Sequence, residues 1–180
     1  MYRSFPSSAR DHFDAMYARH YRHILAYCGR RLPSAEALDA VSDTFLVAWR
    51  RLDDVPPGPA ERPWLYGVAR RVVANHHRSA TRRRQLVERV AGDGKSVLEA
   101  VDAQVLRAEA DQEVIAALDR LGEVDREIVL LRLWEELTHL EIAEIVGMSD
   151  VAVRKRLSRA RRRLQRLLQV DSEPEEVLSE

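Results

Sequence analysis

The sequence contains a single cysteine, Cys28, among its 180 residues. One thiol cannot form an intrachain disulfide and cannot supply a cysteine-based zinc site, so the fold must depend on its hydrophobic core. A lone thiol also suits a reducing compartment, and we expect the protein to be cytoplasmic. Aromatic residues are scarce, at 6% of the chain, which predicts cores built from aliphatic side chains.

Long hydrophobic runs are also missing. No apolar stretch approaches the roughly 20 residues that a membrane-spanning helix needs. The N-terminal segment MYRSFPSSARD lacks the hydrophobic region of a signal peptide, and we expect no direct membrane contact. Hydrophobic residues still make up 46% of the chain, which is too many for a disordered protein and enough for one domain or two small ones.

Acidic residues are absent from two stretches, although the formal net charge of the whole chain is zero. Residues 62–84 hold seven arginines and no acid, and residues 152–166 hold eight arginines or lysines and no acid. Nine acids and only three arginines lie between them, over residues 98–127. Because an ordinary charged surface mixes both signs, this segregation predicts two basic surfaces that bind nucleic acid.

The second basic stretch belongs to a pattern of two short helices joined by a tight turn, residues 138–163. Thr138 and Glu141 have the spacing of a capping box that starts the first helix. Gly147 supplies the conformational freedom that the turn requires. This arrangement is typical of a helix-turn-helix motif that binds duplex DNA.

The second helix of this motif combines a narrow apolar stripe with a cationic surface. Ser149 or Asp150 is a suitable N-cap. The apolar positions recur at helical spacing: Val153, Leu157, Ala160, Leu164 and Leu168. The other side chains are polar or basic, among them Arg154, Lys155, Ser158 and Arg159. The alternative, a merely solvated amphipathic helix, would be expected to carry acids as well.

Hydrophobic spacing predicts three helices in the N-terminal half, over residues 8–31, 35–52 and 64–84. A loop with four prolines and one glycine, residues 53–63, separates the last two. We expect the helix 35–52 to face inward with Leu38, Val41, Phe45, Trp49 and Leu52. A second face of this helix carries Asp39, Asp43, Leu46 and Arg50, and fits either a protein-docking face or ordinary surface.

One side of the helix 64–84 combines an aromatic ring with polar and basic groups. Its members recur at i, i+7, i+11 and i+14: Trp64, Arg71, Asn75 and Arg78. An aromatic ring among cations is typical of surfaces that stack unpaired bases. The alternative is that Trp64 packs at a domain edge, with arginine side chains lying along it.

The C-terminal half predicts a second helical domain. Residues 85–110 have weak periodicity and read as a linker with some helix at its ends. Two further helices, residues 111–121 and 124–135, join the helix-turn-helix to form a domain over residues 111–169. The acidic tail, residues 170–180, is expected to be disordered. The predicted fold is therefore all-α, with two small helical domains joined by a flexible linker.

Three segments of the chain resemble bacterial extracytoplasmic-function RNA polymerase sigma factors, group IV of the sigma-70 family. DAVSDTFLVAW at residues 39–49 is similar to region 2.2 of that family. PWLYGVARR at residues 63–71 is similar to regions 2.3 and 2.4, although Arg71 stands where many members carry asparagine. Residues 137–164 resemble region 4.2 nearly throughout. The three segments occur in the family's order.

The resemblance implies that the chain binds core RNA polymerase, recognises promoter −35 and −10 elements and promotes DNA melting. Docking on the clamp helices of the largest subunit is implied for Asp39, Asp43, Leu46 and Arg50. Contact with the −10 element is implied for Trp64, Arg71, Asn75 and Arg78, with residues 55–62 as the pocket for a flipped base. Contact with the −35 element is implied for Arg154, Lys155, Ser158 and Arg159. The flap of the second-largest subunit is a further implied partner.

The same resemblance implies an anti-sigma factor as a candidate partner, because members are usually restrained by one. The sequence has no phosphate-binding loop, metal-ligand set or nucleophile motif, so we expect no enzyme activity, no metal and no cofactor. The main alternative is a stand-alone helix-turn-helix regulator, which leaves residues 39–84 without a role. An adaptor that sequesters a partner is another. Co-purification with core polymerase distinguishes the stand-alone regulator, and loss of promoter-dependent transcripts in a reconstituted assay would favour the adaptor.

Overall fold

The computed structural model describes residues 7–91 and 109–170, and the regular elements within these ranges are all helical. The all-α fold predicted from the sequence is therefore confirmed for these residues. The chain divides into two compact units, residues 1–103 and 104–180. Within the described ranges, no helix combines the length and the apolar character needed to span a membrane.

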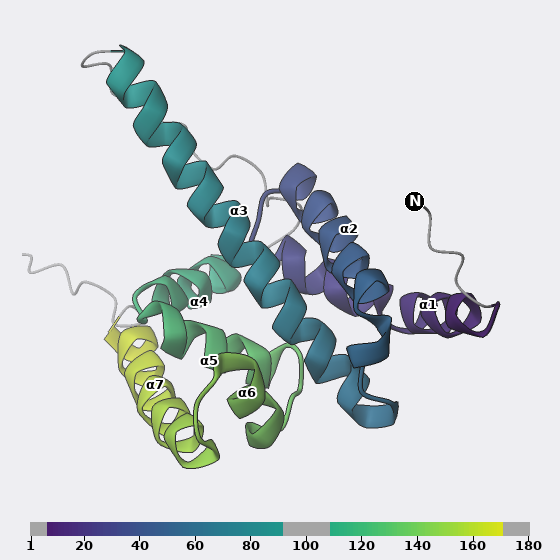
Figure 1. Ribbon diagram of the computed structural model, residues 1–180. Helices are drawn as coiled ribbons and strands as arrows, with labels where there is room; N and C mark the ends of the chain where they lie inside the picture. The colour runs from purple at the N-terminus through teal and green to yellow at the C-terminus, as the bar shows by residue number, and fades with distance from the viewer. Residues whose placement is uncertain (1–6, 92–108, 171–180) are drawn as a thin grey trace, which may run out of the picture. The chain divides into compact units, whose positions relative to one another are not determined.

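The described part of the first unit contains three α-helices that pack against one another (Figure 1). These are α1 (Ser7–Gly29), α2 (Ser34–Arg50) and α3 (Glu61–Ala91). Two short 3₁₀ helices, η1 (Leu52–Asp54) and η2 (Gly58–Ala60), lie between α2 and α3. Leu52 and Val55 are buried, so the proline-rich loop is held at its start by apolar side chains.

Aromatic side chains join α1 to α2. The ring centroids of Tyr17 and Phe45 are 4.6 Å apart, and those of Phe13 and Trp49 are 5.0 Å apart. The prediction of an aliphatic core is wrong for this unit, because ten of the eleven aromatic residues of the chain precede residue 67. The aromatic content averaged over the whole chain, 6%, does not reveal that these residues are concentrated in the first unit. Edge-on and tilted ring pairs of this kind contribute about 0.5–1.5 kcal/mol each beyond their burial.

The buried face of α2 is rotated away from the predicted stripe. Leu38, predicted to face inward, is 53% exposed, whereas Thr44 is fully buried. The other buried positions of this helix are Ala37, Ala40, Val41, Phe45 and Ala48. Alanine side chains let neighbouring helices approach closely, so the bulkiest aliphatic stripe is not the core side here. The Thr44 hydroxyl donates to the Ala40 carbonyl oxygen at 2.7 Å, which satisfies it within the core.

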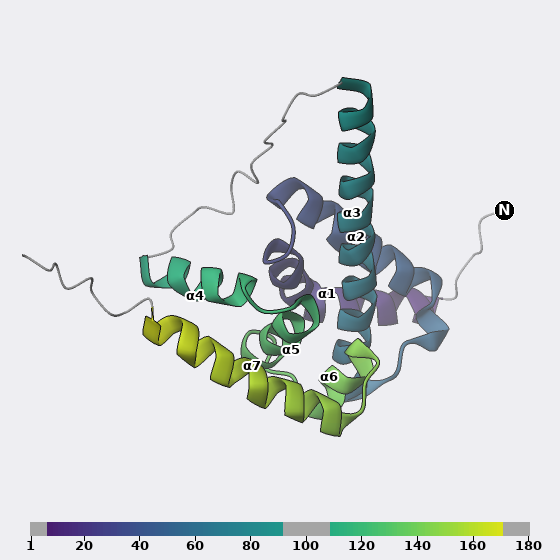
Figure 2. The same ribbon diagram turned by 90° about the vertical axis from the view of Figure 1, so that its left-hand side faces the viewer.

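α3 is 31 residues long, and only its first half is packed into the core. Its buried apolar side chains, among those the structure describes, are Leu65, Tyr66, Val68, Ala69, Val72 and Val73. At 1.5 Å per residue the helix is about 46 Å long, and it extends well beyond α1 and α2 (Figures 1 and 2). The helix ends at Ala91, beyond the predicted bound at residue 84. Residues 92–108 of the expected linker lie outside the described residues.

The described part of the second unit contains α4 (Glu109–Asp119), α5 (Glu123–Leu133), α6 (His139–Val146) and α7 (Asp150–Val170). α7 packs against the other three helices, and its long yellow ribbon is seen from the side in Figure 2. The fully buried aliphatic side chains include Ile128, Leu131, Leu137, Ile142 and Val153. Arg156 Nη1 donates to Asp125 Oδ1 at 2.6 Å and so ties α7 to α5. The tail 171–180 lies outside the described residues.

Candidate nucleic-acid and polymerase-binding surfaces

The turn between α6 and α7 has the local geometry that the sequence predicts. Thr138 Oγ1 accepts a bond from the Glu141 amide at 3.3 Å, and Glu141 Oε2 accepts one from the Thr138 amide at 2.7 Å. The predicted capping box is thus confirmed. Gly147 has a left-handed backbone, with φ 70° and ψ 40°. Ser149 Oγ accepts from the Ala152 amide at 3.2 Å and caps α7.

α7 is held to the second unit along one narrow side. Val153, Leu157 and Ala160 are buried, and Leu164 and Leu168 are half-buried, which confirms the predicted stripe. Burial of one such leucine or valine contributes about 1.5–3 kcal/mol, whereas an exposed ion pair contributes about 0–1 kcal/mol. Apolar packing therefore fixes the helix and leaves its other sides to solvent. The four candidate DNA-reading side chains are all exposed: Arg154, Lys155, Ser158 and Arg159.

One of these side chains has a partner on its own helix. Arg154 forms an ion pair with Asp150, which lies one turn earlier at the N-terminus of α7. The carboxylate is also favoured there by the helix dipole. Because the pair is solvent-exposed, its rupture costs only about 0–1 kcal/mol. An approaching phosphate or guanine can therefore replace Asp150 as the partner of the guanidinium.

The candidate polymerase-docking residues lie on the exposed surface of α2. Asp39, Asp43, Leu46 and Arg50 are all exposed, with Leu46 at 44%. Leu38 adds a second exposed leucine to this helix, and sequence reasoning missed it by assigning it to the core. An alanine-rich pattern at Ala37, Ala40 and Ala48 was the available signal that the core side lay elsewhere.

The candidate −10 residues lie along α3. Arg71, Asn75 and Arg78 are exposed, and Arg78 donates to the side-chain oxygen of Asn75. Trp64 is half-buried, and the guanidinium of Arg51 lies 5.8 Å from the centre of its ring. The cation beside the ring is typical of a base-stacking surface. The partial burial of the ring fits the alternative, in which Trp64 packs at a domain edge.

A groove of about 720 Å³ lies between α2 and α3 and is lined by members of both sets. Asp43, Leu46 and Arg50 line it from α2, and Asn75 lines it from α3. His76 Nε2 lies 3.3 Å from Asp43 Oδ2 across this groove. The structure therefore brings Asn75 of the candidate −10 set together with three candidate docking residues, whereas Trp64, Arg71 and Arg78 do not line this groove. Sequence spacing treated the two sets as separate surfaces.

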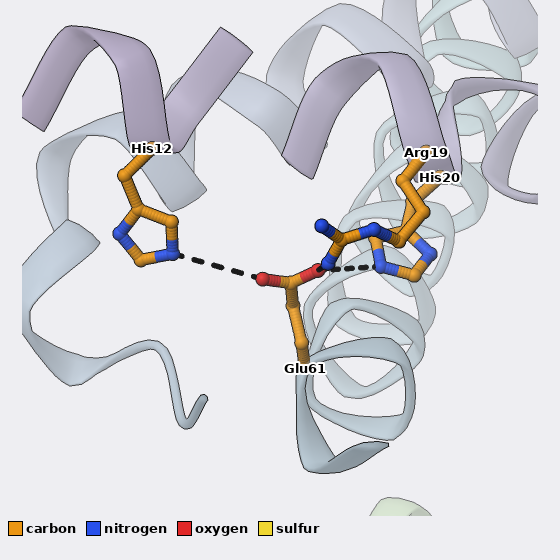
Figure 3. A network of polar contacts seen from close by, with 4 residues as sticks. All are labelled: His12, Arg19, His20 and Glu61. Carbon is orange, nitrogen blue, oxygen red and sulfur yellow. Dashed lines mark hydrogen bonds and ion pairs between the residues drawn. The ribbon is translucent and has the colours of Figure 1, made fainter. Parts of the chain in front are cut away.

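Glu61 is a buried acid that no motif or spacing in the sequence singles out. It is the first residue of α3 and is only 3% exposed. Three side chains of α1 surround its carboxylate (Figure 3). Arg19 Nη1 donates to Oε1 at 2.7 Å, His20 Nε2 lies 2.7 Å from the same oxygen, and His12 Nε2 lies 3.7 Å from Oε2. A segment of α1 is thereby tied to the start of α3.

His20 is the titratable group most affected by this arrangement. Burial lowers the pKa of its imidazole below the ordinary 6.5, and the hydrogen bond to Glu61 only partly offsets this. An ionised carboxylate only accepts hydrogen bonds, so neutral His20 donates to it through Nε2–H. Nδ1 is buried and has no hydrogen-bond partner among the described residues. A second proton there would be a buried donor without an acceptor.

Comparison with known proteins gives matches over both units. The family model described as Sigma-70 region 2 matches residues 16–83, and Sigma-70, region 4 matches residues 111–164. The RNA polymerase sigma factor NccH of Alcaligenes xylosoxydans xylosoxydans is 33% identical over 167 residues, 87% of either chain. The ECF RNA polymerase sigma factor EcfG of Rhodopseudomonas palustris is 31% identical over 133 residues, 74% of this chain and 71% of its own.

A solved structure is similar as well. The sigma factor RpoE of Bartonella quintana, in complex with the anti-sigma factor NepR, matches with a TM-score of 0.64 and 27% sequence identity. The match covers 88% of this chain and 98% of the other.

Proposed function

The chain belongs to the sigma-70 family of RNA polymerase sigma factors, as an extracytoplasmic-function member, and from this premise we propose how its parts share the task. The protein directs core polymerase to promoters and starts transcription. In the proposal, residues 8–84 dock on polymerase and open the −10 element. Residues 111–169 read the −35 element, residues 85–110 connect the two, and residues 170–180 form a separate tail.

The observation that carries this division is the groove between α2 and α3. A stand-alone DNA-binding regulator has no use for it, because the side chains that line it, apart from buried Val72, are exposed or half-buried and are not needed to hold the core together. We propose that Asp39, Asp43, Leu46 and Arg50 bind the clamp helices of the largest subunit. Leu38 joins them as an apolar contact, since burial of an exposed leucine side chain contributes about 1.5–3 kcal/mol.

The proposed −10 surface of α3 combines stacking with charge. Trp64, Arg71, Asn75 and Arg78 would hold the melted strand, and residues 55–62 would receive a base turned out of the stack. Extruding a base costs a few kcal/mol, and each base stacked on an aromatic or guanidinium plane returns about 1–3 kcal/mol. Two or three such contacts therefore suffice to keep a short segment open once polymerase holds the DNA in place.

The proposed −35 surface is the exposed side of α7. Arg154, Lys155, Ser158 and Arg159 would reach base edges and phosphates in the major groove. A good bidentate contact discriminates between bases by about 1–3 kcal/mol. Contacts to phosphate supply affinity and register without reading sequence. The flap of the second-largest subunit is the proposed polymerase partner of this unit.

We further infer that the protein acts by binding alone, without catalysis or a cofactor, in the cytoplasm where polymerase transcribes. Because the relative from Bartonella quintana is described with an anti-sigma factor, we also infer that a protein of this kind restrains the chain. Such a partner would compete with polymerase if it covered the α2 face.

Run-off transcription tests the proposal. Purified protein is added to bacterial core polymerase on DNA fragments from upstream of its own gene and of neighbouring genes, with core polymerase alone as the control. A discrete transcript that depends on the protein supports the function and maps both promoter elements. A protein that binds duplex DNA but neither co-purifies with core polymerase nor yields a transcript would instead be a stand-alone regulator.

A further inference from the structure

The loop between α2 and α3 is anchored at its two ends by different means. At its start, Leu52 and Val55 are buried, and Arg51 Nε donates to Asp54 Oδ2 at 2.8 Å. At its end, Glu61 is buried under α1. The five residues between Val55 and Glu61 contain no buried side chain. Their course is therefore set by the prolines and the η2 turn within the segment and by the two anchors at its ends.

We propose that Glu61 is a positioning residue, whose bonds to Arg19 and His20 fix the loop 55–62 in the shape that receives an unpaired promoter base. This inference rests on the proposed function of that loop and of the neighbouring Trp64. Glu61 itself touches no DNA in the proposal. It acts through the backbone of the residues that precede it and through the first turn of α3.

The carboxylate is bound more tightly than a surface acid would be. A buried charge is costly unless it is paired and hydrogen-bonded, and here Arg19 and His20 both bond to one oxygen while His12 approaches the other. The N-terminus of α3 adds a favourable dipole. These bonds hold the Glu61 carboxylate in one position. They therefore also restrict the backbone of Glu61 and of the loop residues that precede it.

The cluster of Glu61, Arg19 and His20 is built around an ion pair between the glutamate and the arginine. Arg19 brings a permanent positive charge to the same oxygen as His20, and a cation would be repelled there. Among the described residues, no group of three or more His, Cys, Asp and Glu side chains has an arrangement that could hold a metal ion.

The packing of α1 on α3 does not itself depend on Glu61. Tyr27 of α1 and Tyr66 of α3 are fully buried, with ring centroids 5.4 Å apart. Leu65 and Ala69 continue the same core. Loss of the carboxylate should therefore leave the helices packed and release the loop, so positioning and folding can be separated by experiment.

The first measurement follows the loop directly. Gly58 and Ala60 carry the amides within its proline-rich part, and ¹⁵N relaxation of the full-length protein reports their order parameters. In Glu61→Gln these should fall from about 0.85 to below about 0.6, while amides of α2 stay rigid. Glu36→Gln makes the same change in the first turn of α2 and should leave both loop amides unchanged. Unchanged loop amides in Glu61→Gln would overturn the proposal.

The second measurement couples the loop to DNA. Holoenzyme is bound to single-stranded −10 DNA of a mapped promoter, either intact or abasic at the flipped position. Glu61→Gln should weaken binding of the intact strand about tenfold and of the abasic strand less than about twofold, a coupling in the range known for interacting groups. Arg19→Lys, which keeps the charge, should retain most of the preference for the intact strand.

The outcomes separate the two proposals. Equal losses on both strands would show a general structural defect and overturn the positioning role. Wild-type holoenzyme that does not distinguish the two strands would overturn the base-pocket function, while the relaxation measurement still decides whether Glu61 orders the loop.

Discussion

The buried polar residues of the first unit find their partners at very different distances along the chain. Thr44 bonds within its own helix, four residues back. Glu61 bonds to Arg19 and His20, which precede it by 42 and 41 residues. Periodicity within one helix could suggest the first case. It could not suggest the second, because an acid beside four prolines resembles solvent-exposed loop until the fold brings α1 against it.

Lowering the pH should destabilise the first unit through His20. Since the pKa of this imidazole is lower in the folded chain than in the unfolded one, the unfolded chain binds more protons between the two values. The contribution of neutral His20 to the free energy of unfolding is fully present above about pH 6.5. It is lost as the pH falls through the pKa of His20 in the folded chain. Thermal unfolding followed by near-ultraviolet circular dichroism, which reports the aromatic residues of this unit, measures the effect.

Variants of two histidines on α1 make this prediction specific. His20→Gln should flatten the dependence of Tm on pH between about 7.5 and 5.5. His23→Gln changes an exposed histidine on the same helix, which has the smallest effect among the groups acting on the pKa of His20, and should alter the slope much less than His20→Gln does. The groups facing His20 are Arg19 and His23 on α1 and Glu61 on α3. An unchanged slope in His20→Gln would assign the pH dependence to other groups.

Arg71→Ala and Asn75→Ala should impair promoter opening more than polymerase binding. Each variant removes an exposed side chain of α3 that is proposed to contact the melted strand, at a cost of about 1–3 kcal/mol per lost contact. Permanganate reactivity of unpaired thymines measures opening, and titration of labelled protein with core polymerase measures docking. An equal loss in both assays would assign these residues to the polymerase interface.

At the scale of the helix, local sequence signals predicted the second unit better than the first. The capping box at Thr138 and the left-handed Gly147 depend on residues within one turn of each other, and both are confirmed. The face of α2 depends on how closely α1 and α3 approach, which alanines permit and sequence spacing does not reveal. For that reason the spacing predicts a core position for Leu38, whereas its side chain is exposed.

Gly147→Ala should destabilise the second unit, because a left-handed backbone is unfavourable for a residue with a side chain. The expected loss is about 1–2 kcal/mol, and each kcal/mol lowers Tm by about 4–8 °C in a unit of this size. Gly147→Asn is the matched control, since asparagine tolerates the left-handed conformation that this helix end requires. Equal Tm values for the two variants would contradict the prediction.

Leu38→Ala and Leu46→Ala should weaken binding to core polymerase without unfolding the first unit. Both side chains are exposed, so their removal should change stability by less than about 0.5 kcal/mol. If they fill an apolar recess of the clamp, each variant should cost about 1–2 kcal/mol of affinity. Titration with core polymerase and the Tm of the free protein check the two parts. Unchanged affinity would remove these leucines from the docking face.

At the scale of the whole molecule, a net charge of zero coexists with two strongly basic segments. Binding of DNA is governed by the local field at the contact surface rather than by the sum of charges. The acid-free stretches on α3 and α7 can therefore attract phosphates although the chain as a whole is neutral. This segregation could be predicted from the sequence, because a count of charged residues along the chain is enough to detect it.

Salt should weaken promoter binding in proportion to the phosphates contacted. If about six are neutralised, log K falls with log salt at a slope of about −5. Lys155→Gln should reduce the steepness by about 1, since it removes one cationic contact. Ser158→Ala changes a neutral neighbour on the same exposed side of α7 and should keep the slope. Identical slopes for the lysine variant and wild type would exclude a phosphate contact there.

The tie between Glu61 and α1 also bears on the engineering of new promoter preferences. The residues between Val55 and Glu61 can be exchanged without disturbing the core, because the attachments lie at either side of them. A loop transplanted from another sigma factor should keep its shape if the recipient supplies a glutamate at its end and matching donors on the first helix. The loop should therefore be exchanged together with the two positions on α1 that bind its terminal glutamate. A chimaera that receives the loop alone would have the loop sequence of the donor but not its conformation.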